Sequence, residues 1–150
     1  MNGTDPISLV LKAKQHGILA ITPDKPVYDA LSLMAEHHIG ALMVIEAGGK
    51  LVGMISERDY ARKGVLKGHL AKSTRVTEIM TSPVTYVSPS NTVDECMNLM
   101  TEGRFRHLPV VDGEKVVGLV SIGDLVKWII TSQAHQIRDL HGYITGSYPS

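Results

Sequence analysis

A serine and an aspartate three residues apart occur twice in this chain, each time directly after a run of apolar residues. The copies are residues 56–59 (Ser-Glu-Arg-Asp) and 121–124 (Ser-Ile-Gly-Asp). At a helix start this pair forms a capping box, in which serine and acid bind each other's backbone N–H groups. The same groups can bind a nucleotide, because a carboxylate accepts hydrogen bonds from ribose hydroxyls while serine and backbone N–H groups hold phosphate. The twofold occurrence favours the nucleotide interpretation, and capping remains the alternative.

A basic cluster, residues 104–107 (Arg-Phe-Arg-His), precedes a second apolar run. Arginine forks match phosphate oxygens, so the cluster is a candidate phosphate clamp. Arg58, Arg62 and Lys63 are candidates to face the same cleft. The alternative is a solvated loop with ordinary surface charges.

An internal repeat must position these groups. Pro23 aligns with Pro89 and Val27 with Val93, and after a one-residue gap in a turn the alignment continues to the two Ser-x-x-Asp motifs. Each copy predicts a strand, a helix with apolar residues at three- and four-residue steps, two further strands and a second helix. The predicted ranges are strands 19–21, 41–45 and 51–55 with helices from residue 27 and near Ser56, and strands 84–87, 108–111 and 116–120 with helices from residue 93 and near Ser121. The fold class is therefore α+β, with two β-α-β-β-α repeats packed about a pseudo-twofold axis.

Four segments follow from this pattern. Residues 1–17 form an N-terminal flanking helix that starts at Asp5-Pro6, because aspartate suits the N-cap and proline the first helical turn. Residues 18–70 are the first repeat and residues 71–131 the second. Residues 132–150 hold the end of the last helix, which runs to Leu140, and a loose tail.

Composition excludes several classes of protein. The chain has 150 residues, and its 15 basic residues balance its 15 acidic ones, so nothing predicts nucleic-acid binding. No apolar run is long enough to cross a membrane, no signal peptide is recognisable, and the expected location is cytoplasmic. Cys96 is expected to be a buried apolar residue. No catalytic or metal-binding motif is present, so we expect no enzyme and no metal site.

The duplicated unit resembles the CBS domain pair, or Bateman module, in a stand-alone protein. The resemblance spans roughly residues 17–131, and the motifs that carry it are residues 38–44, 51–59, 76–80, 106–112 and 117–124. It implies binding of adenosine compounds (AMP, ADP, ATP, NAD or S-adenosylmethionine) in two clefts, as regulatory ligands rather than catalytic cofactors.

The resemblance also implies the site residues, which come from both repeats in each cleft. One cleft would use Ser121, Gly123 and Asp124 with Lys25, Ala30, Ile39, Gly40 and Ala41. The other would use Ser56, Arg58 and Asp59 with Asn91, Cys96, Phe105, Arg106 and His107. Gly123 departs from the family pattern, in which many members carry a hydroxyl, and this removes one phosphate donor.

The resulting hypothesis is a regulatory adenine-nucleotide-binding module that acts on an unidentified effector protein. A homodimer is expected, because the family commonly dimerises and because Met34, Met97 and Met100 leave surplus apolar surface on the helices. The alternative is a non-catalytic dimeric interaction or assembly protein whose clefts are vestigial. A third hypothesis, an uncharacterised enzyme, is disfavoured because no acid, base or metal set converges.

Overall fold

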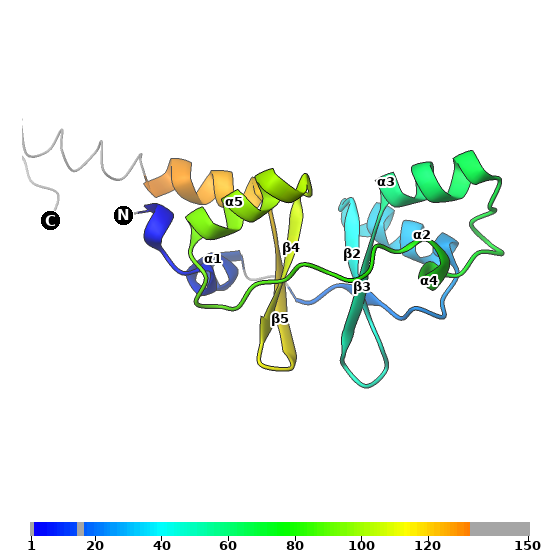
Figure 1. The fold of residues 1–150 in the computed structure, drawn as a ribbon, viewed down its shortest axis with the longest axis horizontal. Coiled ribbons are helices and arrows are strands. Elements are labelled where there is room, and N and C mark those ends of the chain that lie inside the picture. Colours follow the sequence, from blue (N-terminus) through cyan, green and yellow to red (C-terminus); the bar gives the residue numbers. More distant parts are fainter. Residues whose placement is uncertain (1, 15–16, 133–150) are drawn as a thin grey trace, which may run out of the picture. The chain divides into compact units, whose positions relative to one another are not determined.

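Helices and short strands alternate along the chain in the computed structural model, which describes residues 2–14 and 17–132 (Figure 1). The elements are η1 (Asn2–Thr4), α1 (Ile7–Lys14), β1 (Ala20–Ile21), α2 (Val27–His37), β2 (Ala41–Ile45), β3 (Leu51–Ser56), α3 (Glu57–Asp59), the π-helical η2 (Tyr60–Gly64), η3 (Val65–Lys67), α4 (Val76–Ile79), α5 (Val93–Gly103), β4 (His107–Asp112) and β5 (Lys115–Ser121). Residues 122–132 are also helical. This mixture confirms the predicted α+β class. The predicted helix end at Leu140 and the tail after it lie outside the described residues.

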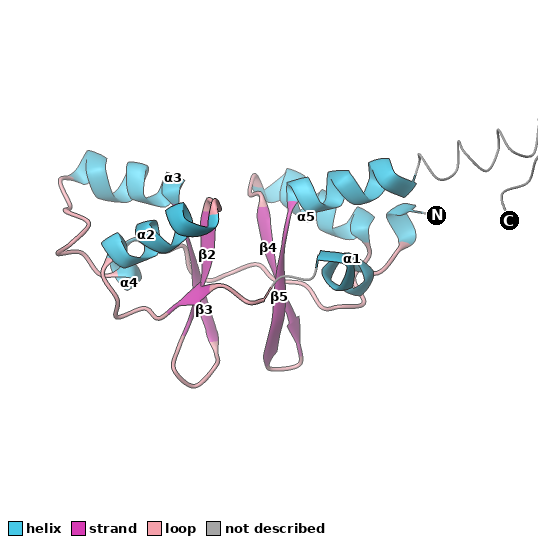
Figure 2. Ribbon diagram, turned by 180° about the vertical axis from the view of Figure 1, so that it is seen from behind, coloured by secondary structure: helices cyan, strands magenta, loops and turns pink. Residues whose placement is uncertain are grey.

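Two compact units make up the chain. Among the described residues, the sheet unit comprises 17–86 and 109–119, and the terminal unit comprises 2–14, 87–108 and 120–132. In the sheet unit β1 pairs with β2 in parallel, with Ala20 opposite Met43, and β2 pairs with β3 antiparallel, with Ala41 opposite Ser56. Gly49 closes the β2–β3 hairpin at a φ of 96°, which glycine adopts without a Cβ clash. Strands β4 and β5 form a second, two-stranded sheet (Figure 2).

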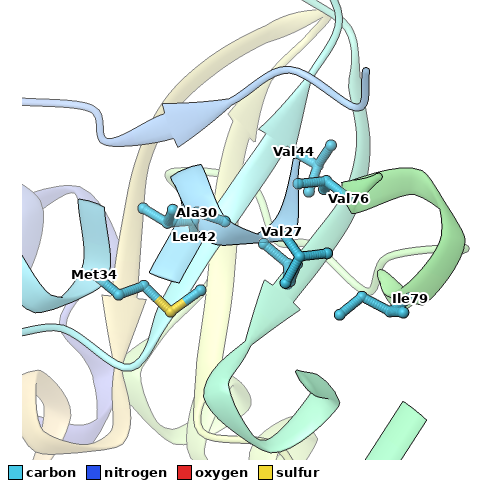
Figure 3. Close-up of a cluster of buried hydrophobic side chains, with 8 residues drawn as sticks. Val27, Ala30, Met34, Leu42, Val44, Val76 and Ile79 are labelled. Carbon is cyan, nitrogen blue, oxygen red and sulfur yellow. The ribbon is translucent and has the colours of Figure 1, made fainter. Parts of the chain in front are cut away.

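The core of the sheet unit forms where α2 and α4 meet the strands. Val27, Ala30 and Met34 recur at three- and four-residue steps along α2, and each is at most 1% exposed. One helix face is therefore apolar, as the sequence predicts. Figure 3 shows this cluster, whose buried members are Val27, Ala30, Met34, Leu42, Val44, Ile55, Val76 and Ile79.

The helices α2 and α5, one from each repeat, end in the same backbone conformation. The residue after α2, His38, has a φ of 54°, and the residue after α5, Arg104, has a φ of 56°. The sequence alignment places these two residues opposite each other, and both adopt the left-handed conformation that terminates helices. At its other end α5 carries a capping box, in which Thr92 Oγ1 accepts a hydrogen bond from the Glu95 N–H at 3.1 Å.

The N-terminal helix α1 belongs to the terminal unit (Figure 2), where the Ile7 N–H donates a hydrogen bond to the Asn91 carbonyl oxygen at 2.7 Å, in the segment that precedes α5. It begins at Ile7, one residue later than predicted. The cause is that Pro6 forms a bridge with Thr92, which keeps the backbone extended there. Asp5 is not the predicted cap, because Pro6 is the residue that directly precedes α1, and the Asp5 carboxylate accepts a hydrogen bond from Trp128 Nε1 at 2.9 Å.

The predicted strand at residues 84–87 does not form, and only Val87 makes a bridge. A run of β-branched and aromatic residues favours extended backbone, but a strand also needs a neighbouring backbone to pair with. The predicted surplus of apolar helix surface is also wrong for two of three methionines, since Met34 is 1% and Met100 3% exposed. Both side chains are buried within a single chain, and Met97 is half-buried.

Candidate functional site

The second Ser-x-x-Asp motif lies where β5 ends and helix 122–132 begins. Ser121 Oγ accepts a hydrogen bond from the Asp124 N–H at 3.1 Å, and Asp124 Oδ2 accepts one from the Ser121 N–H at 2.8 Å. The capping alternative is therefore realised. It occupies only one carboxylate oxygen, and no residue that the structure describes donates a hydrogen bond to Oδ1. A carboxylate oxygen of Asp124 thus remains as an acceptor.

Lys14, the last residue of α1, completes this group of residues. Its ammonium donates a hydrogen bond to Asp124 Oδ2 at 2.8 Å, and the two side chains are 26% and 23% exposed. Sequence reasoning missed Lys14, because nothing in the pattern of residues 7–14 points to a partner 110 residues away. We call Lys14, Arg106, His107, Ser121 and Asp124 the Asp124 half-site.

Opposing effects act on the pKa of Asp124. Burial by itself would raise the pKa of this carboxyl, but hydrogen bonds from Lys14 and from the Ser121 backbone, together with the lysine charge, hold the pKa below its usual 3.8. The aspartate is therefore ionised at neutral pH. An ionised carboxylate is an acceptor only, which suits the hydroxyl groups of a sugar.

His107 and Arg106 stand at the start of β4, next to the same helix start. The Ile122 N–H donates a hydrogen bond to the Arg106 carbonyl oxygen at 2.8 Å, which ties the beginning of β4 to the beginning of helix 122–132. Burial lowers the pKa of His107 below 6.5, Lys14 lowers it further, and the charge of Asp124 opposes this. The imidazole is thus mainly neutral at pH 7, whereas the exposed Arg106 carries a fixed charge.

The first motif shows the same capping geometry in the sheet unit. Asp59 Oδ2 accepts hydrogen bonds from the Ser56 N–H at 2.9 Å and from Ser56 Oγ at 3.0 Å. Here the other oxygen is occupied too, because Thr81 Oγ1 donates to Oδ1 at 3.1 Å and Lys63 Nζ lies 3.5 Å from it. Thr81 is held in place by paired backbone hydrogen bonds with Met54. We call Ser56, Asp59, Lys63 and Thr81 the Asp59 half-site.

A backbone hydrogen bond ties Gly40 to the first motif, and the equivalent bond ties Arg106 to the second. The Glu57 N–H donates a hydrogen bond to the Gly40 carbonyl oxygen at 3.0 Å. The structure therefore brings Gly40 to Ser56, and Arg106 to Ser121, within their own repeats. The cross-repeat groupings implied by the family resemblance stay predictions.

The remaining predicted site residues differ in exposure. Ala30, Ala41 and Cys96 are at most 2% exposed and belong to the core. Burial raises the pKa of the Cys96 thiol to about 11, in agreement with the predicted buried apolar role. Asn91 already donates a hydrogen bond to Glu95 at 2.7 Å and accepts one from the Ser88 N–H. The others comprise Lys25, Arg58 and Gly123, which are exposed, and Ile39 and Phe105, which are half-buried.

A cavity of about 750 Å³ lies in the sheet unit. Its walls come from the β2–β3 turn, from residues 80–86 and from the β4–β5 hairpin, and they include none of the predicted site residues. We place the candidate site at the aspartates, because the ionised and hydrogen-bonding groups gather there. Among the described residues no three His, Cys, Asp or Glu side chains cluster as metal ligands, and no helix is long and apolar enough to span a membrane.

Comparison with known proteins matches residues 14–65 and 76–131 to the CBS domain model. The mitochondrial CBS domain-containing protein CBSX3 of Arabidopsis thaliana is 40% identical over 150 residues, which cover 95% of this chain and 73% of that protein. A protein with CBS domains from Burkholderia ambifaria, described as a candidate for signal transduction, has a solved structure with 54% identity and a TM-score of 0.82. That match covers 86% of this chain and 96% of the other.

A third similar structure contains ligands. It is a CBS domain pair solved with methylthioadenosine and S-adenosyl-L-methionine, with 24% identity and a TM-score of 0.76, and the match covers 86% of this chain and 98% of that one. At this identity the likeness concerns the fold alone.

Proposed function

We propose that this chain, which belongs to the CBS domain family and carries two copies of the domain, is a regulatory module that senses an adenosine-containing ligand and acts on a separate effector protein. Proteins of this family are regulatory modules, and CBS pairs bind adenosine-containing ligands. The finer part of the proposal is the ligand class, an adenine nucleotide such as AMP, ATP or NAD. We further propose that the module works as a homodimer in the cytoplasm.

The observation that carries the proposal is the state of Asp124. Its carboxylate is ionised and a quarter exposed, and Oδ1 lacks a donor among the residues that the structure describes. A helix cap needs only the oxygen that already binds Ser121. The second oxygen is therefore available for a hydroxyl of a bound ribose.

The proposed roles divide by charge. Asp124 and Asp59 accept hydrogen bonds from ribose, whereas Arg58, Arg106 and His107 face phosphate. Arginine matches phosphate in charge and geometry, and a carboxylate repels it. His107 contributes as a neutral donor at pH 7 and gains charge when a bound phosphate raises its pKa.

A thermal-shift panel of AMP, ADP, ATP, NAD, S-adenosylmethionine and adenosine tests the function. A ligand at 100 times its Kd adds ~2.7 kcal/mol to stability, which in a chain of this size shifts Tm by about 5–10 °C. The shift should vanish in the double variant Asp59→Ala, Asp124→Ala and persist in Asp112→Ala, a matched control at an exposed position at the end of β4. Absence of any shift in the unmodified chain would refute nucleotide sensing.

The second candidate function, a non-catalytic interaction protein, has one observation in its favour. Three apolar side chains around η3 are exposed: Val65 by 53%, Leu66 by 80% and Leu70 by 71%. Such residues typically mark surfaces that contact other proteins. Under this alternative the panel above gives no shifts, and substitution of Leu66 and Leu70 by serine abolishes self-association or partner binding.

A further inference from the structure

The two half-sites hold their aspartates with different chemistry. At Asp124 the side-chain donor from outside the motif is the ammonium of Lys14, at 2.8 Å, whereas at Asp59 it is the hydroxyl of Thr81, at 3.1 Å. A second cation, Lys63, lies 3.5 Å from Asp59, but its side chain is 41% exposed, so water screens its charge more strongly. The Asp124 half-site therefore has the closer and more buried cation.

The position of Lys14 leaves room for a ligand at the same carboxylate. Lys14 binds Oδ2, the oxygen that also accepts the Ser121 N–H, so a ribose hydroxyl can bind Oδ1 without displacing the lysine. The pair is only about a quarter exposed (26% and 23%), and charge interactions weaken less where water is partly excluded. Lys14 thus neutralises the aspartate while the acceptor remains in use.

This neutralisation matters for the rest of the ligand. A phosphate that approaches an unpaired, ionised carboxylate is repelled, whereas a sulfonium cation is attracted. Gly123 provides no side chain that could bind phosphate at this helix start. Arg106 supplies one cation to this half-site, and the end of α1 supplies a second, Lys14, which pairs with the carboxylate itself.

We propose that Lys14 is a specificity-determining residue of the Asp124 half-site, which makes this half-site select adenosine compounds that carry a phosphate over those that carry a sulfonium cation. The inference rests on the proposed function, because it assumes that adenosine compounds bind at Asp124. It adds a residue that lies outside the predicted repeats and outside all predicted site residues.

The test uses the full chain with Asp59→Ala, so that one half-site remains, and measures AMP, adenosine and S-adenosylmethionine by calorimetry. In that background Lys14→Gln removes the charge, Lys14→Arg keeps it, and Lys12→Gln removes an equal charge from the exposed face of the same helix. We expect Lys14→Gln to lower the affinity for AMP by about 10-fold or more, the range of one charge-assisted contact. The affinity for adenosine should change less than about 3-fold, and the ratio of S-adenosylmethionine affinity to AMP affinity should rise.

The outcomes separate the inference from its premise. The inference is supported if Lys14→Arg and Lys12→Gln still prefer AMP over S-adenosylmethionine and Lys14→Gln does not. Equal weakening of AMP and adenosine by Lys14→Gln overturns it and makes Lys14 a part of the ribose pocket. Tighter binding of adenosine by Lys14→Gln also overturns it, because the lysine would then compete with ribose. If the parent chain binds none of the three ligands, the proposed function itself fails, and the inference falls with it.

Discussion

The two aspartates should respond differently to the same substitution. We predict that Asp124→Asn lowers adenosine affinity much more than Asp59→Asn does. Asparagine keeps the shape of the side chain and one acceptor oxygen, so the capping hydrogen bond from the serine N–H can persist. What it removes is the charge and the second acceptor.

The magnitude follows from the hydrogen bonds around each carboxylate. At Asp124 a ribose hydroxyl binds Oδ1, which has no donor among the described residues, so one charge-assisted bond is gained. Such a bond contributes ~1.5–3 kcal/mol, which corresponds to about 10- to 150-fold in affinity. At Asp59 the hydroxyl has to replace Thr81 or Lys63 on Oδ1. The net gain is then a difference between similar bonds, ~1 kcal/mol or less, or about 5-fold.

Calorimetry with adenosine on the unmodified chain and the two variants is the assay, with Asp112→Asn as the matched exposed control. Urea unfolding of each variant checks the fold, and losses of stability beyond about 2 kcal/mol would show that the cap had failed. A larger loss of affinity for Asp59→Asn than for Asp124→Asn would refute the reasoning, since an occupied acceptor would then matter more than an available one. Unchanged affinity in both variants would leave the aspartates as helix caps.

Four further predictions concern other parts of the molecule. Because the pKa of His107 is lowered below 6.5 in the native protein, the native imidazole binds fewer protons than the imidazole of the unfolded chain. The contribution of His107 to stability is therefore complete above pH 6.5 and is lost as pH falls through the native pKa. In NMR titrations Lys14→Gln should raise the pKa of His107, and Lys12→Gln should leave it unchanged. Arg106→Ala should weaken AMP more than adenosine, with a difference that shrinks at high salt in calorimetry; equal weakening would place the arginine at the base or ribose. Met34→Ala should destabilise the chain by about 2–5 kcal/mol in urea unfolding, because a fully buried side chain leaves a cavity. Sedimentation should give a dimer, and a monomer at every concentration would contradict the proposed assembly.

The elements of the fold were predictable where local pattern decides them. The apolar spacing of Val27, Ala30 and Met34 predicts α2, and the serines at positions 56 and 121 mark helix starts that the structure confirms. The strand at residues 84–87 was not predictable in the same way, because its existence depends on a backbone neighbour and not on its own residues. Pro6 illustrates the same limit, since its bridge to Thr92 moves the start of α1 by one residue.

The residues of the candidate site likewise fall into those that the local sequence predicts and those that it does not. The serines and aspartates could be found from the repeated motif, because both members of each pair lie within one turn of helix. Lys14 and Thr81 could not, because their partners are 110 and 22 residues away. Local periodicity carries no information about such contacts. Lys63, four residues after Asp59, is the exception, since that spacing places two side chains on one helix face.

Thr81 and Lys14, which bind the two aspartates from far along the sequence, occupy related places in the two repeats. Thr81, which binds the aspartate of the first repeat, lies near the start of the second repeat. Lys14, which binds the aspartate of the second repeat, lies in the segment that leads into the first. The repeat alignment that pairs Pro23 with Pro89 pairs Lys14 with Met80, one position from Thr81. The residues near the start of each repeat therefore bind the aspartate of the other repeat, at nearly equivalent positions. The partner from outside the motif is a hydroxyl at Asp59 and an ammonium at Asp124, so two half-sites with the same capping geometry differ in the chemistry that surrounds the carboxylate.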